Sequence, residues 1–276
     1  MTPVTFHAAQ NCDSILIFIV ILFLILCRQS KITIRIRIKL GNQDTARIAS
    51  PFSCPSLFPS CMKTSLALLV AFISAAFAAD PELPQTKLAQ IDKLVPVNPI
   101  EGSALSEKWK AAKGKWEVVD GTIRGAELAA DKHGAVMRTA QKLKDIVIAY
   151  EVKLDGAKMT SLSINGPKDH LARIMISPNR FIVQRDDQDH DGPDKVVVFL
   201  TKPVELAPGT WHTVVLEMVG DKMVGTLDGK ITGEGSDPTF AANAKSNPGF
   251  TVAGESASFR NVRIYSAKPD PKAGGK

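Results

Sequence analysis

The densest cluster of side chains able to do chemistry is the acidic run Arg185-Asp-Asp-Gln-Asp-His-Asp-Gly-Pro-Asp194. Within it, Asp187, Asp189 and Asp191 alternate along the chain and are followed by a glycine. Alternate carboxylates can converge on one hard cation and glycine permits a sharp turn, as in the first half of a calcium-binding loop. The twelfth position of such a loop, normally a bidentate glutamate, is Val198. The run therefore predicts a Ca²⁺ site that a second loop must complete.

Two other interpretations of this run remain open. His190 could join the carboxylates around a transition metal, because imidazole and carboxylate ligands suit such ions. Alternatively, the run is an acidic turn between two apolar strands, kept soluble by its charge. No cofactor other than this candidate calcium follows from the sequence.

Several common catalytic motifs are missing. All four cysteines precede Met62, so residues 62–276 contain no thiol nucleophile, no thiolate metal ligand and no disulfide. The sequence also lacks Gly-x-Ser-x-Gly, a P-loop and His-Glu-x-x-His. These absences argue against a cysteine enzyme, a nucleophile-elbow hydrolase, a P-loop enzyme and a zincin protease.

The elements that must position any site are short strands. The segment 145–154 alternates between apolar residues on one side (Ile146, Ile148, Tyr150, Val152, Leu154) and a mixed set on the other. The segment 211–219 alternates in the same way, with His212, Val214, Leu216 and Met218 on one side. Further strands are expected at 170–177, 181–186, 195–201, 250–253 and 259–265. No helical period persists after Ala79, so the pattern predicts an all-β sandwich or barrel.

Two Asp-Gly dipeptides mark tight hairpins. Asp120-Gly121 separates two apolar segments, and Asp228-Gly229 separates two more. Both dipeptides tolerate the positive φ angles that a two-residue hairpin turn needs. The outward side chains of the predicted strands include Glu151, Ser161, Ser163, Arg173 and Gln184. Such a polar face is either an ordinary solvated surface or a ligand-binding surface.

A secretory signal peptide is predicted at residues 62–78. Met62-Lys63 is a basic start, residues 66–73 are apolar, and Ala76-Phe77-Ala78 has small residues at the two positions that a signal peptidase tests. The apolar segment is too short for a stable membrane span. We therefore expect the protein to be secreted, or to lie in the periplasm or cell envelope, with no membrane span in the mature domain.

Residues 1–61 are interpreted as a spurious upstream extension. Their apolar run, 15–26, has twelve residues, whereas a membrane helix needs roughly 20. The alternative is a genuine signal-anchor followed by the basic strand 31–39. In that case the protein would be an envelope-attached structural module.

Charge argues against a nucleic-acid partner. Of 34 lysines and arginines and 28 aspartates and glutamates, seven and two lie in residues 1–78, which leaves 27 and 26 in residues 79–276. The mature chain is therefore near neutral and lacks the basic balance of a nucleic-acid-binding domain. Its expected parts are a proline-rich linker or arm (79–100) with a short helical turn around Leu88, Ile91 and Leu94, a sandwich domain (101–267) and a disordered tail (268–276).

Three stretches together resemble a known family. They are Lys115-Trp-Glu-Val-Val-Asp-Gly-Thr-Ile-Arg-Gly, the segment Pro208-Gly-Thr-Trp to Leu-Asp-Gly-Lys230, and the closing strand Ser258-Phe-Arg-Asn-Val-Arg-Ile-Tyr. This order resembles the concanavalin-like (LamG-like) jelly rolls, and within them the secreted 3-keto-disaccharide hydrolase (3-keto-glucoside lyase/hydratase) domains. The resemblance covers about residues 100–267. It implies an antiparallel two-sheet jelly-roll sandwich and a carbohydrate partner.

Most residues that carry the resemblance are structural. Trp211 follows a Pro-Gly turn at a strand start, where a large ring can cap one end of a core. Phe259, Val262 and Ile264 are expected to be the inward set of the closing strand.

The resemblance also implies a reaction. A ketone at C3 of a sugar acidifies the C2 hydrogen, so a base can remove that proton and the C1 substituent can leave, with a cation stabilising the enolate oxygen. Glu151 or His170 would be the base and Arg173 would stabilise the oxyanion. Gln184 and Asp186 would bind the substrate. Without the resemblance, all five read as solvated strand and loop residues.

The sequence supports two alternative functions. The first is an exported carbohydrate-active domain acting on 3-keto-glycosides, of hydrolase or lyase type. The second is a non-catalytic glycan-binding or surface-interaction jelly roll, favoured by the small number of exposed aromatic residues and by the lack of an obvious acid–base pair. The paired-acid pattern Glu-x-Asp-x-x-Glu of laminarinase-type glycosidases is absent, which argues against a retaining two-carboxylate hydrolase of that type.

Overall fold

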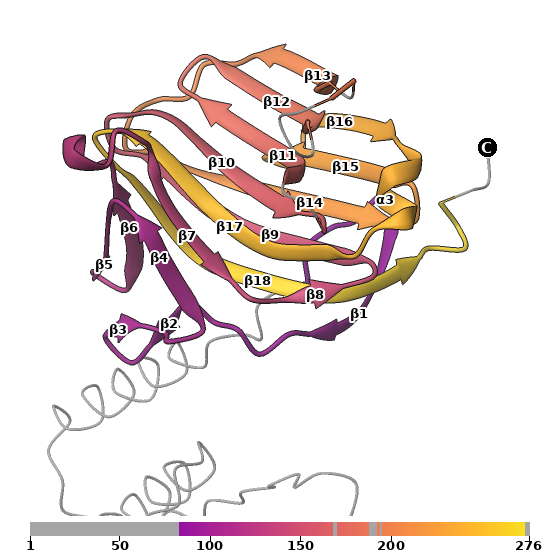
Figure 1. Ribbon diagram of the computed structural model, residues 1–276, viewed down its shortest axis with the longest axis horizontal. Coiled ribbons are helices and arrows are strands. Elements are labelled where there is room, and N and C mark those ends of the chain that lie inside the picture. The colour runs from indigo at the N-terminus through magenta and orange to yellow at the C-terminus, as the bar shows by residue number, and fades with distance from the viewer. Residues whose placement is uncertain (1–82, 168–169, 188–191, 194, 274–276) are drawn as a thin grey trace, which may run out of the picture. The chain divides into compact units, whose positions relative to one another are not determined.

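The computed structural model describes residues 83–167, 170–187, 192–193 and 195–273, and two large antiparallel sheets make up most of this part of the chain (Figure 1). The predicted signal peptide and upstream extension lie outside the described residues. The first sheet has the spatial order β16 (Ile231–Ser236), β15 (Lys222–Leu227), β14 (Trp211–Val219), β9 (Ile146–Leu154), β18 (Ala257–Pro269), β6 (Thr122–Ala126) and β5 (Lys115–Val119), with β1 (Ala89–Leu94) also paired to β18.

The second sheet faces the first across the core. Its order is β13 (Val197–Pro203), β12 (Arg180–Arg185), β11 (His170–Ser177), β10 (Ala157–Asn165), β17 (Lys245–Gly254), β7 (Ala135–Thr139) and β4 (Trp109–Lys113), with β8 (Lys142–Leu143) also paired to β17. Smaller elements complete the described chain: the ribbon of β2 (Ile100–Glu101) and β3 (Ala104–Leu105), a 3₁₀ turn (Ala129–Asp131) and the short helix α3 (Pro238–Ala242). The predicted jelly-roll sandwich is confirmed.

Strand β9 shows how side-chain alternation builds this architecture. Ile146, Ile148, Tyr150, Val152 and Leu154 all lie in the main core, as their alternation predicts. Burial also raises the pKa of the Tyr150 phenol above its ordinary value.

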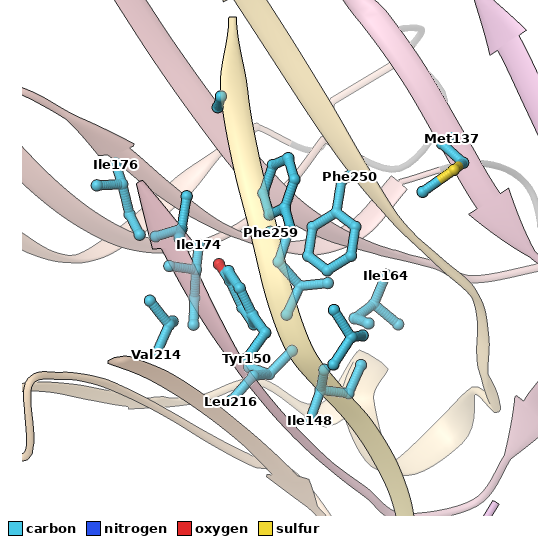
Figure 2. Close-up of a cluster of buried hydrophobic side chains, with 14 of the residues drawn as sticks. Met137, Ile148, Tyr150, Ile164, Ile174, Ile176, Val214, Leu216, Phe250 and Phe259 are labelled. Carbon is cyan, nitrogen blue, oxygen red and sulfur yellow. The ribbon is translucent and has the colours of Figure 1, made fainter. Parts of the chain in front are cut away.

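Aromatic rings from both sheets meet in the middle of the core (Figure 2). Phe250 of the second sheet stacks on Phe259 of the first at a centroid distance of 4.4 Å, and Tyr150 meets Phe250 edge-on at 5.0 Å. The ring of Trp109 also stacks on that of Phe250, at a centroid distance of 5.8 Å. The Trp109 indole nitrogen donates to the Val97 carbonyl at 2.8 Å, so its one polar atom is satisfied although the ring is buried.

The closing strand also has the predicted inward set. Phe259, Val262 and Ile264 all belong to the core, although their spacing is not strictly two. A register shift between Arg260 and Arg263 against β9 absorbs the extra residue. The strand continues to Pro269, so it includes two residues that the sequence assigned to the tail.

Both Asp-Gly hairpins are confirmed. Asp120 and Asp228 have φ angles of 48° and 52°, and each precedes a glycine that also has a positive φ. They connect β5 to β6 and β15 to β16. The left-handed backbone explains why the turn needs residues that tolerate it.

The prediction of a helical turn around Leu88, Ile91 and Leu94 is wrong. The segment forms strand β1, which pairs with β18, and Leu88 and Ile91 pack on the outer face of the first sheet. The fully buried Glu217 carboxylate anchors this arm, because it accepts hydrogen bonds from the backbone N–H groups of Lys87, Leu88 and Ala89 at 2.8–3.1 Å. Pairing outside the segment therefore overrides its local pattern.

The prediction that Trp211 caps the core is also wrong. Its ring lies on the outer face of the first sheet, where the Arg260 guanidinium carbon is 4.2 Å from the ring centroid. Trp109 and Trp116 lie in the core instead. Trp211 is on the outward side of the alternation because His212 and Val214 take the inward side.

Among the described residues, no helix is long and apolar enough to cross a membrane.

Candidate functional site

A row of side chains crosses the outer face of the second sheet. Arg138, Gly249, Ser163, Arg173 and Gln184 are successive cross-strand partners on β7, β17, β10, β11 and β12. We call these five residues the polar row. Partners in register share one face of a sheet, so the row places chain segments far apart in sequence side by side.

The polar row faces away from the core because its neighbours along each strand face inward. Ile164, Ile174 and Val183 flank row residues and are completely buried in the main core. Strict alternation then turns Ser163, Arg173 and Gln184 outward.

Asp186 holds Arg173 and Gln184 of the polar row in place. Its carboxylate accepts a 2.6 Å hydrogen bond from the Gln184 amide, and its other oxygen lies 3.1 Å from Nε of Arg173. The Asp186 side chain is 5% exposed, whereas that of Arg173 is 25% exposed. Within the described part of the chain, the two terminal nitrogens of Arg173 have no hydrogen-bond or ion-pair partner. The result is a fixed cation with donors left for a ligand.

Arg138 approaches the same place from the other end of the row. It donates to Ser163 Oγ at 3.0 Å and to the Asn247 carbonyl at 2.9 Å. To reach Ser163 it crosses β17 at Gly249, where a Cβ atom would lie 2.4 Å from Cγ of Arg138. The missing side chain at Gly249 is therefore what lets Arg138 lie across the sheet toward the strand of Arg173.

His170 lies on the same strand as Arg173, as the first residue of β11. Its cross-strand partner is Asn165, the last residue of β10, and its Nδ1 atom is buried. The structure therefore brings His170, Arg173 and Gln184 onto neighbouring strands of one sheet, with Asp186 directly after the end of β12.

Glu151 does not join them. It lies on β9 in the first sheet and faces away from the core, so the full sandwich separates it from Arg173. Its carboxylate accepts two hydrogen bonds from Arg260 and one from the Asn261 amide. Alternation correctly predicted that Glu151 of β9 and Arg173 of β11 face away from the core. It could not predict that the two strands belong to different sheets, so that these side chains lie on opposite sides of the sandwich.

The calcium prediction stays a prediction. Asp189, Asp191 and the alternative ligand His190 lie outside the described residues, and Asp187 directly follows the Asp186 anchor. Among the described residues, no three His, Cys, Asp or Glu side chains are grouped closely enough to hold a metal.

A buried cation elsewhere is closed to ligands. Lys245 is 1% exposed, donates to the Phe240 carbonyl at 2.7 Å and lies 3.6 Å from the Asp145 carboxylate. Burial lowers the pKa of Lys245, and the Asp145 charge opposes that shift. Lys245 lies on β17 and its bond to Phe240 joins that strand to α3 inside the protein. We therefore interpret the Lys245–Asp145 ion pair as structural.

Sequence reasoning missed Arg138 and Gly249. The segment 135–139 alternates buried and partly exposed residues, so a period-two signal was present there but is only five residues long. Nothing local marks Gly249 as a crossing point, because its function depends on a side chain 111 positions earlier in the chain.

The sequence profile that matches this chain places its antiparallel jelly roll among the carbohydrate-active β-sandwich domains. More specifically, the chain belongs to the family of 3-keto-alpha-glucoside-1,2-lyase-like domains, whose sequence profile matches residues 96–265. The predicted family resemblance is confirmed. No curated protein sequence matches the chain significantly.

Solved structures with a similar fold include three carbohydrate-related proteins. The carbohydrate-binding module CBM66 from Bacillus subtilis is 13% identical, with a TM-score of 0.47 over 58% of this chain and 96% of that one. A putative glycosyl hydrolase from Parabacteroides distasonis is 17% identical, with a TM-score of 0.39 over 58% and 88%. The alginate lyase from Klebsiella pneumoniae is 10% identical, with a TM-score of 0.40 over 55% and 84%.

Proposed function

We propose that this domain acts on 3-keto-glycosides, cleaving the bond at C1 by elimination, and that the reaction takes place on the polar row. The observation that carries the proposal is Arg173. Its guanidinium is partly exposed, is fixed at Nε by the buried Asp186, and keeps both terminal nitrogens without a partner among the described residues. Family membership supplies the substrate class.

A preorganised cation is what an enolate intermediate requires. Because Asp186 and Gln184 already hold each other, Arg173 needs little reorganisation when negative charge develops on the C3 oxygen. Donors positioned before the reaction stabilise developing charge most effectively. Asp186 is therefore a positioning residue, and Arg173 is the group that touches the substrate.

The bond changes balance without any further reactant. The C2–H bond breaks, its proton passes to a base, and its electron pair forms the enolate with negative charge on the C3 oxygen. The enolate then expels the C1 substituent with its electron pair, which leaves a C1–C2 double bond conjugated to the restored ketone. The departing oxygen takes up the proton, so the base ends in its starting state.

His170 is our choice for the base. Of the two bases that the resemblance implies, only His170 shares a sheet with Arg173, since Glu151 lies on the opposite side of the sandwich. Imidazole also has the intrinsic pKa best suited to proton transfer near neutral pH.

The test uses the purified chain from residue 79 and a 3-keto-glucoside, with release of the C1 substituent as the readout. We expect Arg173→Gln to lower kcat/KM about 100- to 1000-fold, the cost of removing one donor to an oxyanion. The matched control is Arg180→Gln, an exposed arginine of the same sheet outside the row, which should leave kcat/KM unchanged. His170→Asn should abolish the reaction with the fold intact.

Two outcomes would contradict the proposal. A kcat/KM that Arg173→Gln leaves unchanged would show that the polar row takes no part in the reaction. Saturable glycan binding without any turnover by the parent protein would instead identify a non-catalytic binding domain.

We also propose that the protein acts outside the cytoplasm, on the strength of the predicted signal peptide at 62–78. The N-terminal residue of the exported protein, determined by intact mass, should be Ala79. A start well before Ala79 would contradict the predicted cleavage site.

A further inference from the structure

Strand β13 has one free side, because it pairs with β12 and with no other described strand (Figure 1). An edge strand presents a row of unpaired backbone N–H and C=O groups to any further strand that approaches it. Apolar side chains accompany this row, since Val196, Val197 and Val198 are 46%, 39% and 51% exposed. Valine favours extended backbone, so this edge offers another strand both hydrogen bonds and apolar contact.

The other three sheet edges carry charges that β13 lacks. Strand β4 carries Lys110 and Lys113, and it has a register shift against β7. Strand β5 carries the ion pair of Lys115 and Glu117, and β16 carries the exposed Glu234. Charged side chains and bulges on an edge discourage pairing with another chain. The first five residues of β13, in contrast, carry no charge.

The irregularity in β13 leaves its valines at the edge. A register shift against β12 takes Phe199 out of the regular pairing. Phe199 and Leu200 both pack against the main core, and the Phe199 ring meets that of Phe240 edge-on at 6.1 Å. The extra residue therefore turns two consecutive apolar side chains inward. Val197 and Val198 stay paired with β12 and remain exposed.

Charges of opposite sign lie beyond the two ends of the strand. Lys195 precedes β13 and Glu205 follows it, and both are exposed and lack an ion-pair partner within the described chain. Residues 204–206 continue alongside residues 178–179, to which their backbone N–H groups donate. In an antiparallel pair of identical strands, the start of each strand lies beside the end of the other. Self-pairing would therefore bring Lys195 of each copy toward Glu205 of the other.

We propose that β13 is the interface of a homodimer, in which a second copy of this chain pairs with it antiparallel through its own β13. The second copy fits this edge because one uncharged strand serves both sides and the charges at its ends match under a two-fold axis. Such an axis stands perpendicular to the sheet, so it keeps the same face of both copies on one side. Val198 is the cross-strand partner of Gln184, so the two polar rows would follow one another along a continuous sheet.

Sedimentation of the purified protein over a range of concentrations tests the dimer. We expect a monomer–dimer equilibrium, and we expect Val197→Lys to raise the dissociation constant at least tenfold because a lysine enters the paired edge. The matched control is Leu128→Lys, which replaces a leucine that is 43% exposed and lies between β6 and β7. It should leave the dissociation constant unchanged. Circular dichroism of both variants should match that of the parent protein.

Reversal of the end charges provides a second test that leaves the strand itself intact. Lys195→Glu and Glu205→Lys should each raise the dissociation constant about tenfold, because like charges then meet at two symmetric places. The double variant restores opposite signs and should recover the affinity of the parent protein. A parent protein that is monomeric at the highest concentration reached would overturn the proposal. So would a dimer that Val197→Lys leaves intact, or a double variant that dimerises no better than the single ones.

Discussion

At the scale of single residues, buried carboxylates fix the parts of this protein that its sheets alone would leave loose. Glu217 and Asp186 are both buried. Glu217 accepts from three backbone N–H groups, whereas Asp186 accepts from the Gln184 amide and pairs with the Arg173 charge. Glu217 anchors the N-terminal arm, whereas Asp186 orients Arg173. A buried charge without partners would be costly, so both residues require the contacts that they stabilise.

We predict that Glu217→Gln lowers the free energy of unfolding by about 1–3 kcal/mol, because the neutral amide is a poorer acceptor for three backbone N–H groups. Chemical denaturation followed by tryptophan fluorescence would measure the change. The control is Glu234→Gln, an exposed glutamate of β16, which should be close to neutral. Equal stabilities for the two variants would show that the arm does not depend on its carboxylate anchor.

At the scale of elements, the two Asp-Gly hairpins both begin with an aspartate at positive φ but differ in loop length and surroundings, with residues 120–121 between paired positions in one and 228–230 in the other. Asp228 accepts hydrogen bonds from the Thr213 N–H at 2.8 Å and has a 2.9 Å contact with Nδ1 of His212. These contacts tie the β15–β16 turn to β14. Asp120 makes no comparable side-chain contact within the described chain.

We therefore predict that Asp228→Ala costs about 1–2 kcal/mol more stability than Asp120→Ala. Both substitutions put alanine at a positive φ, so the backbone strain is common to the two variants and the difference reports the side-chain contacts. Thermal unfolding of both variants would measure it. If the two variants unfold at the same temperature, the Asp228 contacts contribute nothing to stability.

At the scale of the whole molecule, the sandwich has two outer faces with different uses. The outer face of the first sheet is partly covered by the arm, which packs on Val147, Val215 and neighbouring residues. The outer face of the second sheet bears the polar row. Glu151 therefore cannot act on a substrate that Arg173 holds.

The corresponding prediction is that Glu151→Gln leaves kcat/KM on a 3-keto-glucoside unchanged while lowering the unfolding temperature, since the Arg260 side chain loses its carboxylate partner. Initial rates and a thermal melt on the same preparation would check both halves. A loss of activity as large as that of Arg173→Gln would mean that the two faces do not act separately.

Much of this architecture can be read from the sequence, because alternation and turn chemistry are local. The inward set of β9, the two Asp-Gly hairpins and the inward residues of β18 need only the side-chain period of an extended chain and residues that tolerate positive φ. Where pairing with a distant strand decides the outcome, local patterns fail: the segment around Ile91 becomes β1 because β18 is available to it.

The sequence by itself determined that this protein is all-β, which residues of β9 and β18 face its core, and that Ser163, Arg173 and Gln184 face outward. Only the tertiary structure decided which strands are neighbours. Strand order is set by long-range pairing, so it alone placed Glu151 on the opposite side from Arg173 and brought Arg138 across Gly249 to Ser163. The candidate site is a product of that order, since its residues come from five strands of one sheet.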